Sequence, residues 1–428
     1  MNQYNILVFP CGTEIANEVI SSIKNHKYFK LFYASSEKLS YCNFIGNKIY
    51  QLPYVSDKSF LSSLNELISK LRIDFIIPAH DDVAYELSKN SKKINSKIIG
   101  QSFEVNNIVR FKDKTYDFFK NILPIPKIYN DIPKKNDFPV FVKPKRGQGS
   151  LNALSLKNLD EFESFFKTHS RDDFVVMELL TGKEFTIDCF SHNGELLYFG
   201  ARTRDKTMKG ITVVSSFVNE DSLNKEFKKY ANTISKELKM HGVWFFQMKY
   251  DKNNKLKLLE IGPRVAGSMI LNRMRGVNFI ELAIYQALGM DIKVNVNPVY
   301  DLRMGRALHS IFKTDIKYNN LYIDFDDTLL LDEKHLNIDL MKLIFKAKNE
   351  DKKIYLITKN KKNNLTKILH KFGIMHIFDE IIHLYENQKK IDFMKKNSVL
   401  IDDSFKERTE ALDAGIYSFD VNSINVLL

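Results

Sequence analysis

VWFFQMKYDKNNKLKLLEIGPR (Val243–Arg264) is the part of the sequence around which the rest of the chain is organised. Two apolar, β-rich runs flank the turn-forming tetrapeptide Asp251–Asn254, and this order predicts a β-hairpin. With these four residues as the loop, Gln247 lies opposite Leu258, and Glu260 lies one diagonal step away on the same face. An amide oxygen and a carboxylate on one strand pair suit Mg²⁺. Taken alone, the stretch also fits an ordinary amphipathic hairpin with Glu260 solvated.

Length and composition set the class of protein. A chain of 428 residues with 44% hydrophobic residues predicts two or three globular domains. The formal charge of +12 comes from scattered lysines among many Asn and Ile residues, a pattern typical of an AT-rich genome rather than of a nucleic-acid track. No cationic leader precedes an apolar run and no 18 apolar residues are consecutive, so we expect a cytoplasmic protein without membrane insertion. We expect buried, reduced thiols at Cys11, Cys42 and Cys189.

Strand, turn and helix patterns fill the first hundred residues. The apolar run Tyr4–Phe9 leads through a tight turn into a helical pattern, and the strands 29–34 and 74–78 continue the series. This predicts a doubly wound parallel sheet. The Gly-rich dinucleotide fingerprint is missing, which argues against a nicotinamide cofactor. Asp81 follows the last strand, where α/β ligands bind, so it is a candidate substrate-binding residue and an equally good helix N-cap.

A second informative stretch lies in the middle of the chain. The strand Asp137–Lys143 runs into the Gly-rich loop Pro144–Ser150. A lysine followed by such a loop can cover phosphates with backbone N–H groups and cationic side chains, although plain β-turns share this composition. Phe174–Leu180 is the next apolar strand.

The stretches VKPKRGQGS, VVMELLTGKEFTID, VWFFQMKYD and LLEIGPRVAGS, in this order, resemble the ATP-grasp superfamily, and specifically the carboxylate-amine ligases related to carbamoyl-phosphate synthase. The resemblance covers residues 1 to about 310. It implies transfer of the γ-phosphoryl group of ATP to a carboxylate, followed by attack of an amine. The resemblance implies that the ATP phosphates are held by Lys114 and Lys143 and covered by the loop residues Gly147, Gly149 and Ser150. It implies that adenine is bound by Glu178 and Leu180, ribose by Glu184, and Mg²⁺, or Mn²⁺ in its place, by Gln247 and Glu260. The reacting phosphate would meet Arg264, and the substrate or acyl phosphate would meet Arg202 and Arg204.

One residue departs from the family pattern. The wider family has Asn two residues after its glutamate, whereas this chain has Gly262. Glycine offers no side-chain oxygen, so the number of Mg²⁺ ions, one or two, stays open.

A second chemistry begins after residue 320. The apolar strand LYI leads into Asp324-Phe325-Asp326-Asp327-Thr328, and a buried strand end keeps three acids only when a cation neutralises them. A second strand ends at Thr358, Lys389 and Lys390 follow, and a third strand ends at Asp402 and Asp403.

This series resembles the haloacid dehalogenase (HAD) superfamily of phosphatases over residues 319–428. The resemblance implies Asp324 as the nucleophile that forms an aspartyl phosphate and Asp326 as the general acid and base. Thr358 and Lys390 would hold the phosphoryl group, with Lys389 the alternative. The Mg²⁺ site would draw on Asp324, Asp326, Asp402 and Asp403. The short intervals between the motifs leave no room for a cap domain.

We therefore predict a multidomain protein of α/β and α+β class. Its parts are a Rossmann-like pre-ATP-grasp domain (1–100), an ATP-grasp domain (101–312), a linker (313–319) and a capless HAD-like Rossmannoid domain (320–428). The expected substrates are a small-molecule carboxylate and an amine, and one alternative is that they are sugar-linked or phosphorylated. We do not expect nucleic acid as a partner. The oligomeric state stays open.

The predicted function is that of a bifunctional enzyme, an amide-forming ligase fused to a Mg²⁺-dependent phosphatase. The whole architecture loosely resembles fused proteins of bacterial surface-polysaccharide (capsule) clusters. Two alternatives remain: a nucleotide-binding scaffold with an active phosphatase domain, and a phosphatase that processes nucleic-acid ends.

Overall fold

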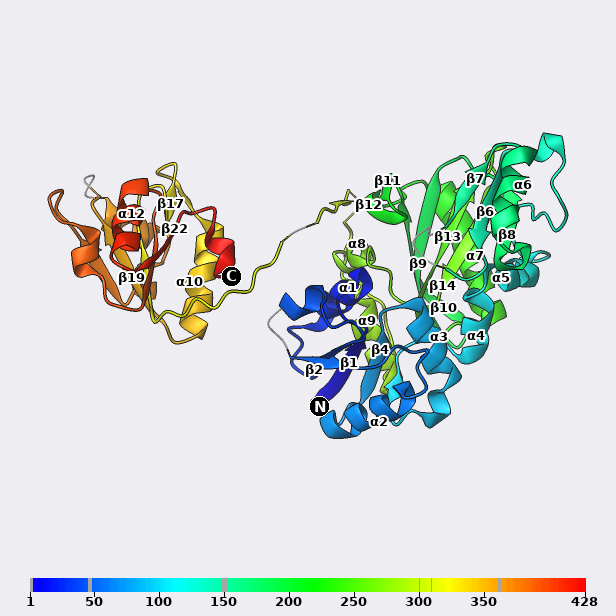
Figure 1. Cartoon of the computed structure of the whole chain (residues 1–428), viewed down its shortest axis with the longest axis horizontal. Coiled ribbons are helices and arrows are strands. Elements are labelled where there is room, and N and C mark those ends of the chain that lie inside the picture. The colour runs from blue at the N-terminus through cyan, green and yellow to red at the C-terminus, as the bar shows by residue number, and fades with distance from the viewer. Residues whose placement is uncertain (1–2, 45–47, 148–151, 300, 309, 361–363) are drawn as a thin grey trace. The chain divides into compact units, whose positions relative to one another are not determined.

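The chain folds into two compact units, Met1–Leu308 and His309–Leu428. The computed structural model describes residues 3–44, 48–147, 152–299, 301–308, 310–360 and 364–428 (Figure 1). The predicted domains 1–100 and 101–312 form one unit, and the boundary lies four residues before the predicted end of the second domain.

The first sheet of the N-terminal unit is parallel, with the strand order β3-β2-β1-β4-β5. Its strands are β1 (Tyr4–Phe9), β2 (Phe29–Ser35), β3 (Ile49–Gln51), β4 (Phe75–Pro78) and β5 (Lys97–Ile98). Along β1, Ile6 and Val8 pack with α1 (Glu14–Ile23) and α9 (Phe279–Ala287), whereas Leu7 and Phe9 pack on the other face with α2 (Phe60–Leu71) and α3 (Asp81–Lys89). The alternation of a strand thus gives the sheet a core on each face, as the sequence predicts.

Local signals fix where the helices begin. Thr13 accepts a hydrogen bond from the backbone N–H of Ala16 and caps α1. The prediction that Asp81 is an N-cap is wrong: His80 is the N-cap of α3 and accepts from the N–H of Asp82. The Asp81 side chain is therefore left for another partner.

The rest of this unit is built on antiparallel sheets. A four-stranded sheet has the order β10-β9-β13-β14, a three-stranded sheet β7-β6-β8, and another β11-β12-β15. The strands are β6 (Val140–Pro144), β7 (Leu154–Leu156), β8 (Phe174–Glu178), β9 (Glu184–His192), β10 (Glu195–Thr203), β11 (Lys206–Met208), β12 (Ile211–Ser216), β13 (Gly242–Tyr250), β14 (Leu256–Gly262) and β15 (Arg303–Gly305). The helices are α4 (Phe103–Val109), α5 (Lys112–Phe119), α6 (Leu159–Thr168), α7 (Asp221–Leu238) and α8 (Ile270–Arg273). The apolar stripe of α7 packs on the four-stranded sheet around the buried Trp244.

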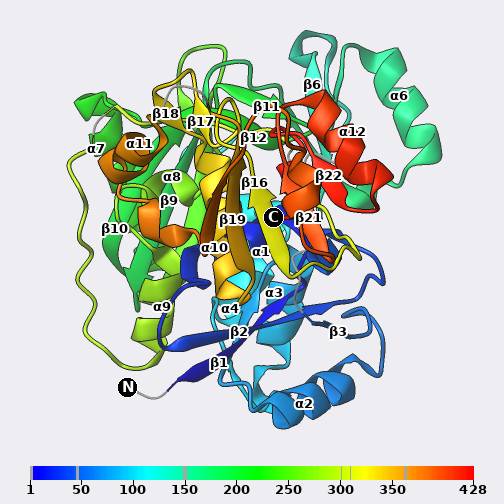
Figure 2. The same cartoon turned by 90° about the vertical axis from the view of Figure 1, so that its left-hand side faces the viewer.

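The C-terminal unit is a parallel sheet with helices. Its strand order is β20-β19-β16-β21-β22. Figure 2 labels β19, β16, β21 and β22 of this sheet. The strands are β16 (Asn320–Ile323), β19 (Lys353–Thr358), β20 (Glu380–His383), β21 (Ser398–Ile401) and β22 (Tyr417–Phe419), and the helices are α10 (Ile338–Asn349), α11 (Leu365–Lys371) and α12 (Phe405–Asp413). The order reverses at β16, so the carboxyl ends of β16, β19 and β21 meet at a switch point of the kind that binds ligands.

The described connections of this unit are short. A small hairpin of β17 (Leu330–Leu331) and β18 (His335–Leu336) and the helix α10 lie between β16 and β19. Among the described residues, neither this connection nor the next one contains a cap domain, in agreement with the spacing of the sequence motifs.

Candidate active sites

The hairpin of β13 and β14 forms, but its register differs from the prediction. Gln247 pairs directly with Glu260, not with Leu258, which pairs with Met248. The partner of Gln247 is shifted by two positions, and each position has its own cause. The backbone N–H of Asp251 donates to the carbonyl of Lys255, which lengthens the loop by one residue, and a bulge places Leu259 outside the pairing. The two predicted metal ligands are thus closer neighbours than the sequence indicated.

The bulge gives the Leu259 carbonyl two side-chain donors. It accepts a hydrogen bond from the Tyr116 hydroxyl at 2.8 Å and from Lys143 Nζ at 3.2 Å. Lys143 also donates to the Tyr116 hydroxyl at 2.6 Å. Burial, aided by the nearby charge of Lys112, lowers the pKa of Lys143 to about 7. Lys143 is therefore a buried group whose ammonium form a bound anion would stabilise.

A cavity of about 310 Å³ opens beside Lys143, and we call it the Lys143 cavity. Among the predicted residues, its wall contains Lys143, Gly147, Leu180, Glu184, Arg204, Gln247 and Glu260. Glu184 forms ion pairs with Arg204 at 2.6 Å and with Lys249 at 3.4 Å. The predicted phosphate, adenine, ribose and metal residues thus line one space.

Two of the predicted nucleotide-binding residues that the structure describes lie outside that cavity. The Glu178 N–H donates to the Lys127 carbonyl and its carboxylate accepts from the Lys127 N–H, so this N–H is not free for adenine. Lys114 Nζ donates to Asn107 at 2.8 Å and lies over the Phe111 ring. Helical spacing turns Lys114 away, because residues two apart do not share a helix face.

Lys112 lines the cavity in place of Lys114, although it is not among the residues predicted from the sequence. Its ammonium group donates to the Gly147 carbonyl at 3.0 Å. Burial lowers its pKa, and the charge of Glu260 opposes this shift. The signal was present in the stretch FKDK, but the sequence did not show which of its two lysines faces inward.

A second cavity of about 280 Å³, the Arg264 cavity, adjoins the first and shares Lys112, Gly147, Gly210, Arg204, Gln247, Leu259 and Glu260 with it. Its wall carries the ion pair of Arg264 with Asp81, in which Nε lies 2.6 Å from Oδ1. Burial would raise the pKa of Asp81, but Arg264 outweighs it and the pKa is lowered. The carboxylate is therefore ionised and holds the guanidinium group in place.

Arg202 lines the same cavity from within the protein. It is fully buried and makes a bidentate ion pair with Asp188, at 2.8 and 3.1 Å. Its Nη1 has no hydrogen-bond partner among the described residues. A buried donor of this kind favours an acceptor atom on a ligand. Gly147 lines both cavities, whereas Gly149 and Ser150 lie outside the described residues.

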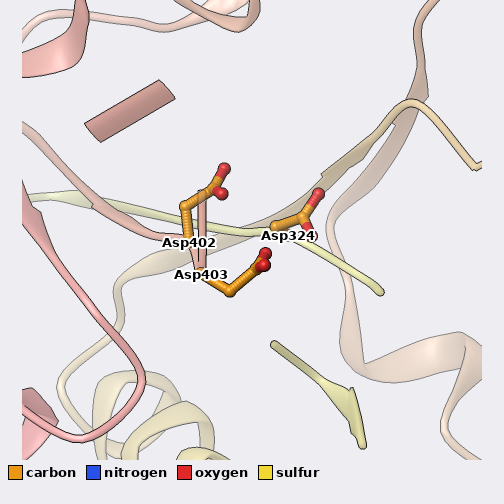
Figure 3. Close-up of side chains that lie close together, drawn as sticks. All are labelled: Asp324, Asp402 and Asp403. Atoms are coloured by element: carbon orange, nitrogen blue, oxygen red, sulfur yellow. The ribbon is translucent and has the colours of Figure 1, made fainter. Parts of the chain in front are cut away.

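In the C-terminal unit, three carboxylates gather at the strand ends. Side-chain oxygens of Asp324, Asp402 and Asp403 lie within 4.8 Å of one another (Figure 3). Hard oxygen donors in this arrangement suit Mg²⁺. The Asp326 side chain, predicted as a metal ligand, is not part of this cluster. Its carboxylate accepts hydrogen bonds from Asn360 instead.

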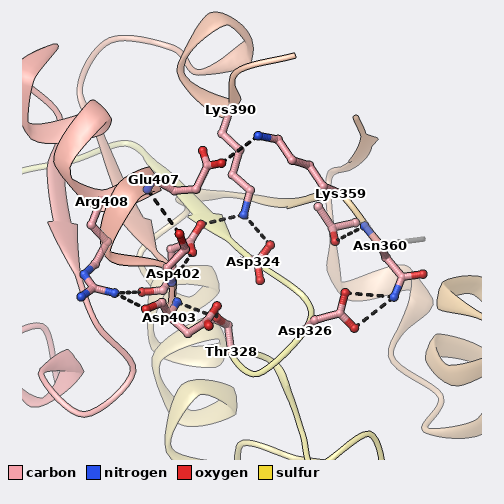
Figure 4. Close-up of polar contacts among 12 residues, drawn as sticks. Asp324, Asp326, Thr328, Lys359, Asn360, Lys390, Asp402, Asp403, Glu407 and Arg408 are labelled. Carbon is pink, nitrogen blue, oxygen red and sulfur yellow. Dashed lines mark hydrogen bonds and ion pairs between the residues drawn. The ribbon is translucent and has the colours of Figure 1, made fainter. Parts of the chain in front are cut away.

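Lys390 lies against this cluster, whereas Lys389 is exposed. Lys390 Nζ lies 2.5 Å from Asp324 and 2.6 Å from Asp402 (Figure 4). Burial raises the pKa of Asp324 to about 7 against the opposing charge of Lys390, with repulsion from Asp402 adding to it. The buried lysine thus neutralises a pair of carboxylates that repel each other.

Asn360, which is not among the residues predicted from the sequence, connects Asp326 with Thr358. Its Nδ2 donates to both oxygens of Asp326, at 3.0 and 2.9 Å. Its backbone N–H donates to Thr358 Oγ1 and its carbonyl meets His383 Nε2. Figure 4 shows Asp326 turned toward Asn360 and Lys390 toward Asp324.

Residues 170–308 match the family described as ATP-grasp in the biosynthetic pathway with Ter operon. A carbamoyl-phosphate synthase of Methanobrevibacter smithii is 21% identical over 263 residues, which are 56% of this chain and 70% of that protein. The match places residues 170–308 in the ATP-grasp superfamily.

Solved structures share the fold. N5-carboxyaminoimidazole synthetase of Staphylococcus aureus with ADP gives a TM-score of 0.57 at 15% identity, covering 68% of this chain and 79% of that one. A biotin carboxylase of Campylobacter jejuni gives 0.56 at 16% identity, covering 68% and 72%. An L-amino acid ligase of Bacillus licheniformis gives 0.54 at 18% identity, covering 67% and 75%. None of the helices in the described residues has both the length and the apolar character needed to cross a membrane.

Proposed function

We propose that residues 1–308 form an ATP-dependent carboxylate-amine ligase, with ATP in the Lys143 cavity and the carboxylate and amine in the Arg264 cavity. One observation carries this proposal: the two cavities meet at Gln247 and Glu260, the paired oxygen donors of the hairpin. A phosphoryl group passing between the cavities would cross this edge. The match of residues 170–308 to the ATP-grasp superfamily supports the same assignment.

The metal donors fit one divalent ion. Gln247 and Glu260 lie opposite each other, and neither side chain has a hydrogen bond or ion pair to another described residue. They would hold Mg²⁺, or Mn²⁺ in its place, and the ion would neutralise phosphate charge.

The cationic side chains have separate tasks. Lys143 and Lys112 would contact the phosphates, Leu180 would meet the adenine and Glu184 the ribose. Arg264 faces the other cavity, fixed by Asp81, where it would contact the transferred phosphoryl group.

The reaction balances as two transfers. The substrate carboxylate attacks the γ-phosphorus of ATP, ADP leaves, and an acyl phosphate forms. The amine then attacks the acyl carbon, phosphate leaves, and the amine loses a proton. The Nη1 donor of Arg202 would orient the acyl oxygen, because it is held by Asp188 and has no other partner among the described residues.

For residues 320–428 we propose a phosphatase. Asp324 would attack phosphorus, Asp326 would protonate the leaving oxygen and later deprotonate water, and Thr358 and Lys390 would hold the phosphoryl oxygens. Asp324, Asp402 and Asp403 would bind Mg²⁺. The motif order, the switch point at β16 and the carboxylate cluster support this assignment.

The two activities on one chain suggest one pathway. We propose that the phosphatase removes phosphate from the amine precursor or from the ligated product, in the assembly of a bacterial surface polysaccharide. The observation behind this proposal is that one chain carries both the two adjoining cavities and the carboxylate cluster.

The test is ADP and phosphate release from Mg-ATP with pools of carboxylates and amines. ADP formation should require a carboxylate and be lost in Glu260→Ala, while Lys252→Ala, in the exposed hairpin loop, keeps it. Asp324→Asn should leave ADP formation unchanged and abolish phosphate release from phosphorylated amines. ADP formation that ignores Glu260 would contradict the ligase, and phosphate release that ignores Asp324 would contradict the phosphatase.

A further inference from the structure

The hairpin face that carries the metal donors also carries an aromatic ring. Phe245 pairs with Gly262, and the next pair along the strands on this face is Gln247 with Glu260. Because side chains alternate along a strand, residues two apart point the same way. Phe245 and Gly262 therefore lie beside the proposed metal site.

The Phe245 ring occupies the space above Gly262. A Cβ atom added at position 262 would lie 2.2 Å from both Cε1 and Cζ of that ring. Phe245 is 5% exposed, and the guanidinium carbon of Arg264 lies 5.7 Å from its centroid. The ring is thus held between the sheet and a cation, so a side chain at 262 has no room unless the ring moves.

Two cationic side chains lie near this position. Lys112 is half-buried and lines both cavities together with Glu260. Arg264 lies over the ring. A second divalent ion at this position would meet like charges and an apolar ring instead of an oxygen donor.

We infer that the nucleotide site binds a single divalent ion, held by Gln247 and Glu260, because Phe245 and Gly262 together close the position of a second one. The inference rests on the proposed ATP-dependent function and assigns its metal count. Lys112 and Lys143 line the Lys143 cavity. They would neutralise the phosphate charge that a second ion would otherwise neutralise.

The experiment counts Mn²⁺ by electron paramagnetic resonance on the full chain with the non-hydrolysable analogue AMP-PNP. Mn²⁺ that binds without nucleotide is subtracted, which removes the contribution of the C-terminal carboxylates. The wild type should bind one nucleotide-dependent Mn²⁺ per AMP-PNP and show no spin coupling. The double variant Phe245→Ala/Gly262→Asn, which exchanges the ring for an amide oxygen, should bind two and show a coupled signal.

Single variants separate the metal count from folding. Gly262→Asn alone should lower the melting temperature because its side chain meets the Phe245 ring. Gly305→Asn is the matched control, because nothing lies within 4 Å of a Cβ at Gly305.

Each outcome decides one point. Two coupled ions in the wild type overturn the inference while ATP binding stands. One ion in both the wild type and the double variant overturns the assignment to Phe245 and Gly262. A failure of the wild type to bind AMP-PNP overturns the proposed ligase, and the metal count with it. If the double variant does not fold, the wild-type count and the melting temperatures of the single variants still decide.

Discussion

Arg264 and Asp81 stand 183 residues apart in the sequence and form an ion pair in which Arg264 Nη2 lies 2.8 Å from Asp81 Oδ2. The pair joins the first turn of α3 to the segment after β14, so the parallel-sheet half of the unit orients a side chain of the hairpin half. We therefore expect the proposed ligase activity to depend on both halves.

Asp81→Asn should slow ADP formation with little effect on ATP binding. The variant keeps the shape of the side chain but removes the charge that fixes Arg264, and a misplaced catalytic group costs up to about 100-fold in rate. Steady-state kinetics with a carboxylate pool should show a fall of about 10- to 100-fold in kcat and a KM for ATP within about twofold. Glu18→Gln is the control, because it breaks the bidentate pair with Arg273 away from the cavities. An equal loss in the control would assign the effect to folding.

ATP binding should take up a proton at alkaline pH. With a pKa of about 7, Lys143 is mostly neutral at pH 8 in the nucleotide-free protein, and bound phosphates stabilise its ammonium form. Calorimetry at pH 8 in buffers of different ionisation enthalpy should show uptake of about one proton per nucleotide, with none at pH 6. Affinity should be about tenfold weaker at pH 8 than at pH 6. Uptake that persists in Lys143→Gln would contradict this origin.

Lys390→Met should destabilise the C-terminal unit selectively. It leaves Asp324 and Asp402 buried without their ammonium partner, and breaking such a pair costs about 3–5 kcal/mol of unfolding free energy. Circular dichroism in urea should show an early transition that Mg²⁺ moves back toward the wild type. The single tryptophan, Trp244, lies in the N-terminal unit, so its fluorescence should not change. Lys389→Met, at the exposed neighbour, should behave as the wild type.

Asn360→Ala should make phosphate release depend on the leaving group. The amide of Asn360 contacts both oxygens of Asp326, the proposed general acid. Alkyl phosphates need a proton on the departing oxygen and should lose about 10- to 100-fold in kcat. p-Nitrophenyl phosphate, whose leaving group needs no proton, should lose much less. An equal loss for both substrates would mean that Asn360 only supports the fold.

The sequence predicted the strands better than the contacts between them. The apolar run Tyr4–Phe9 located β1 to the residue. The register of the hairpin was wrong because a sequence does not show whether a turn has four or five residues, nor where a bulge inserts. Gln247 and Glu260 were nevertheless chosen correctly as neighbours on one face.

The choice between adjacent lysines depends on three-dimensional packing. Lys112 and Lys114, like Lys389 and Lys390, have similar neighbours in the sequence, and only the phase of the helical turn decides which one faces the site. Asn360 was missed for the same reason, because its partner Asp326 lies on another strand end. Periodicity identifies faces, whereas ligand sets require tertiary structure.

The bulge at Leu259 also affects how this chain can be compared with its relatives. Each strand of the hairpin keeps its own ligand, but the number of residues between Gln247 and Glu260 combines the loop length with the bulge. A relative with the same loop but without the bulge would carry the residue that lies opposite Gln247 one position earlier in its sequence. An alignment that keeps the number of residues between the two ligands constant would then assign the second ligand to the wrong residue. Equivalent positions in this hairpin therefore have to be assigned strand by strand.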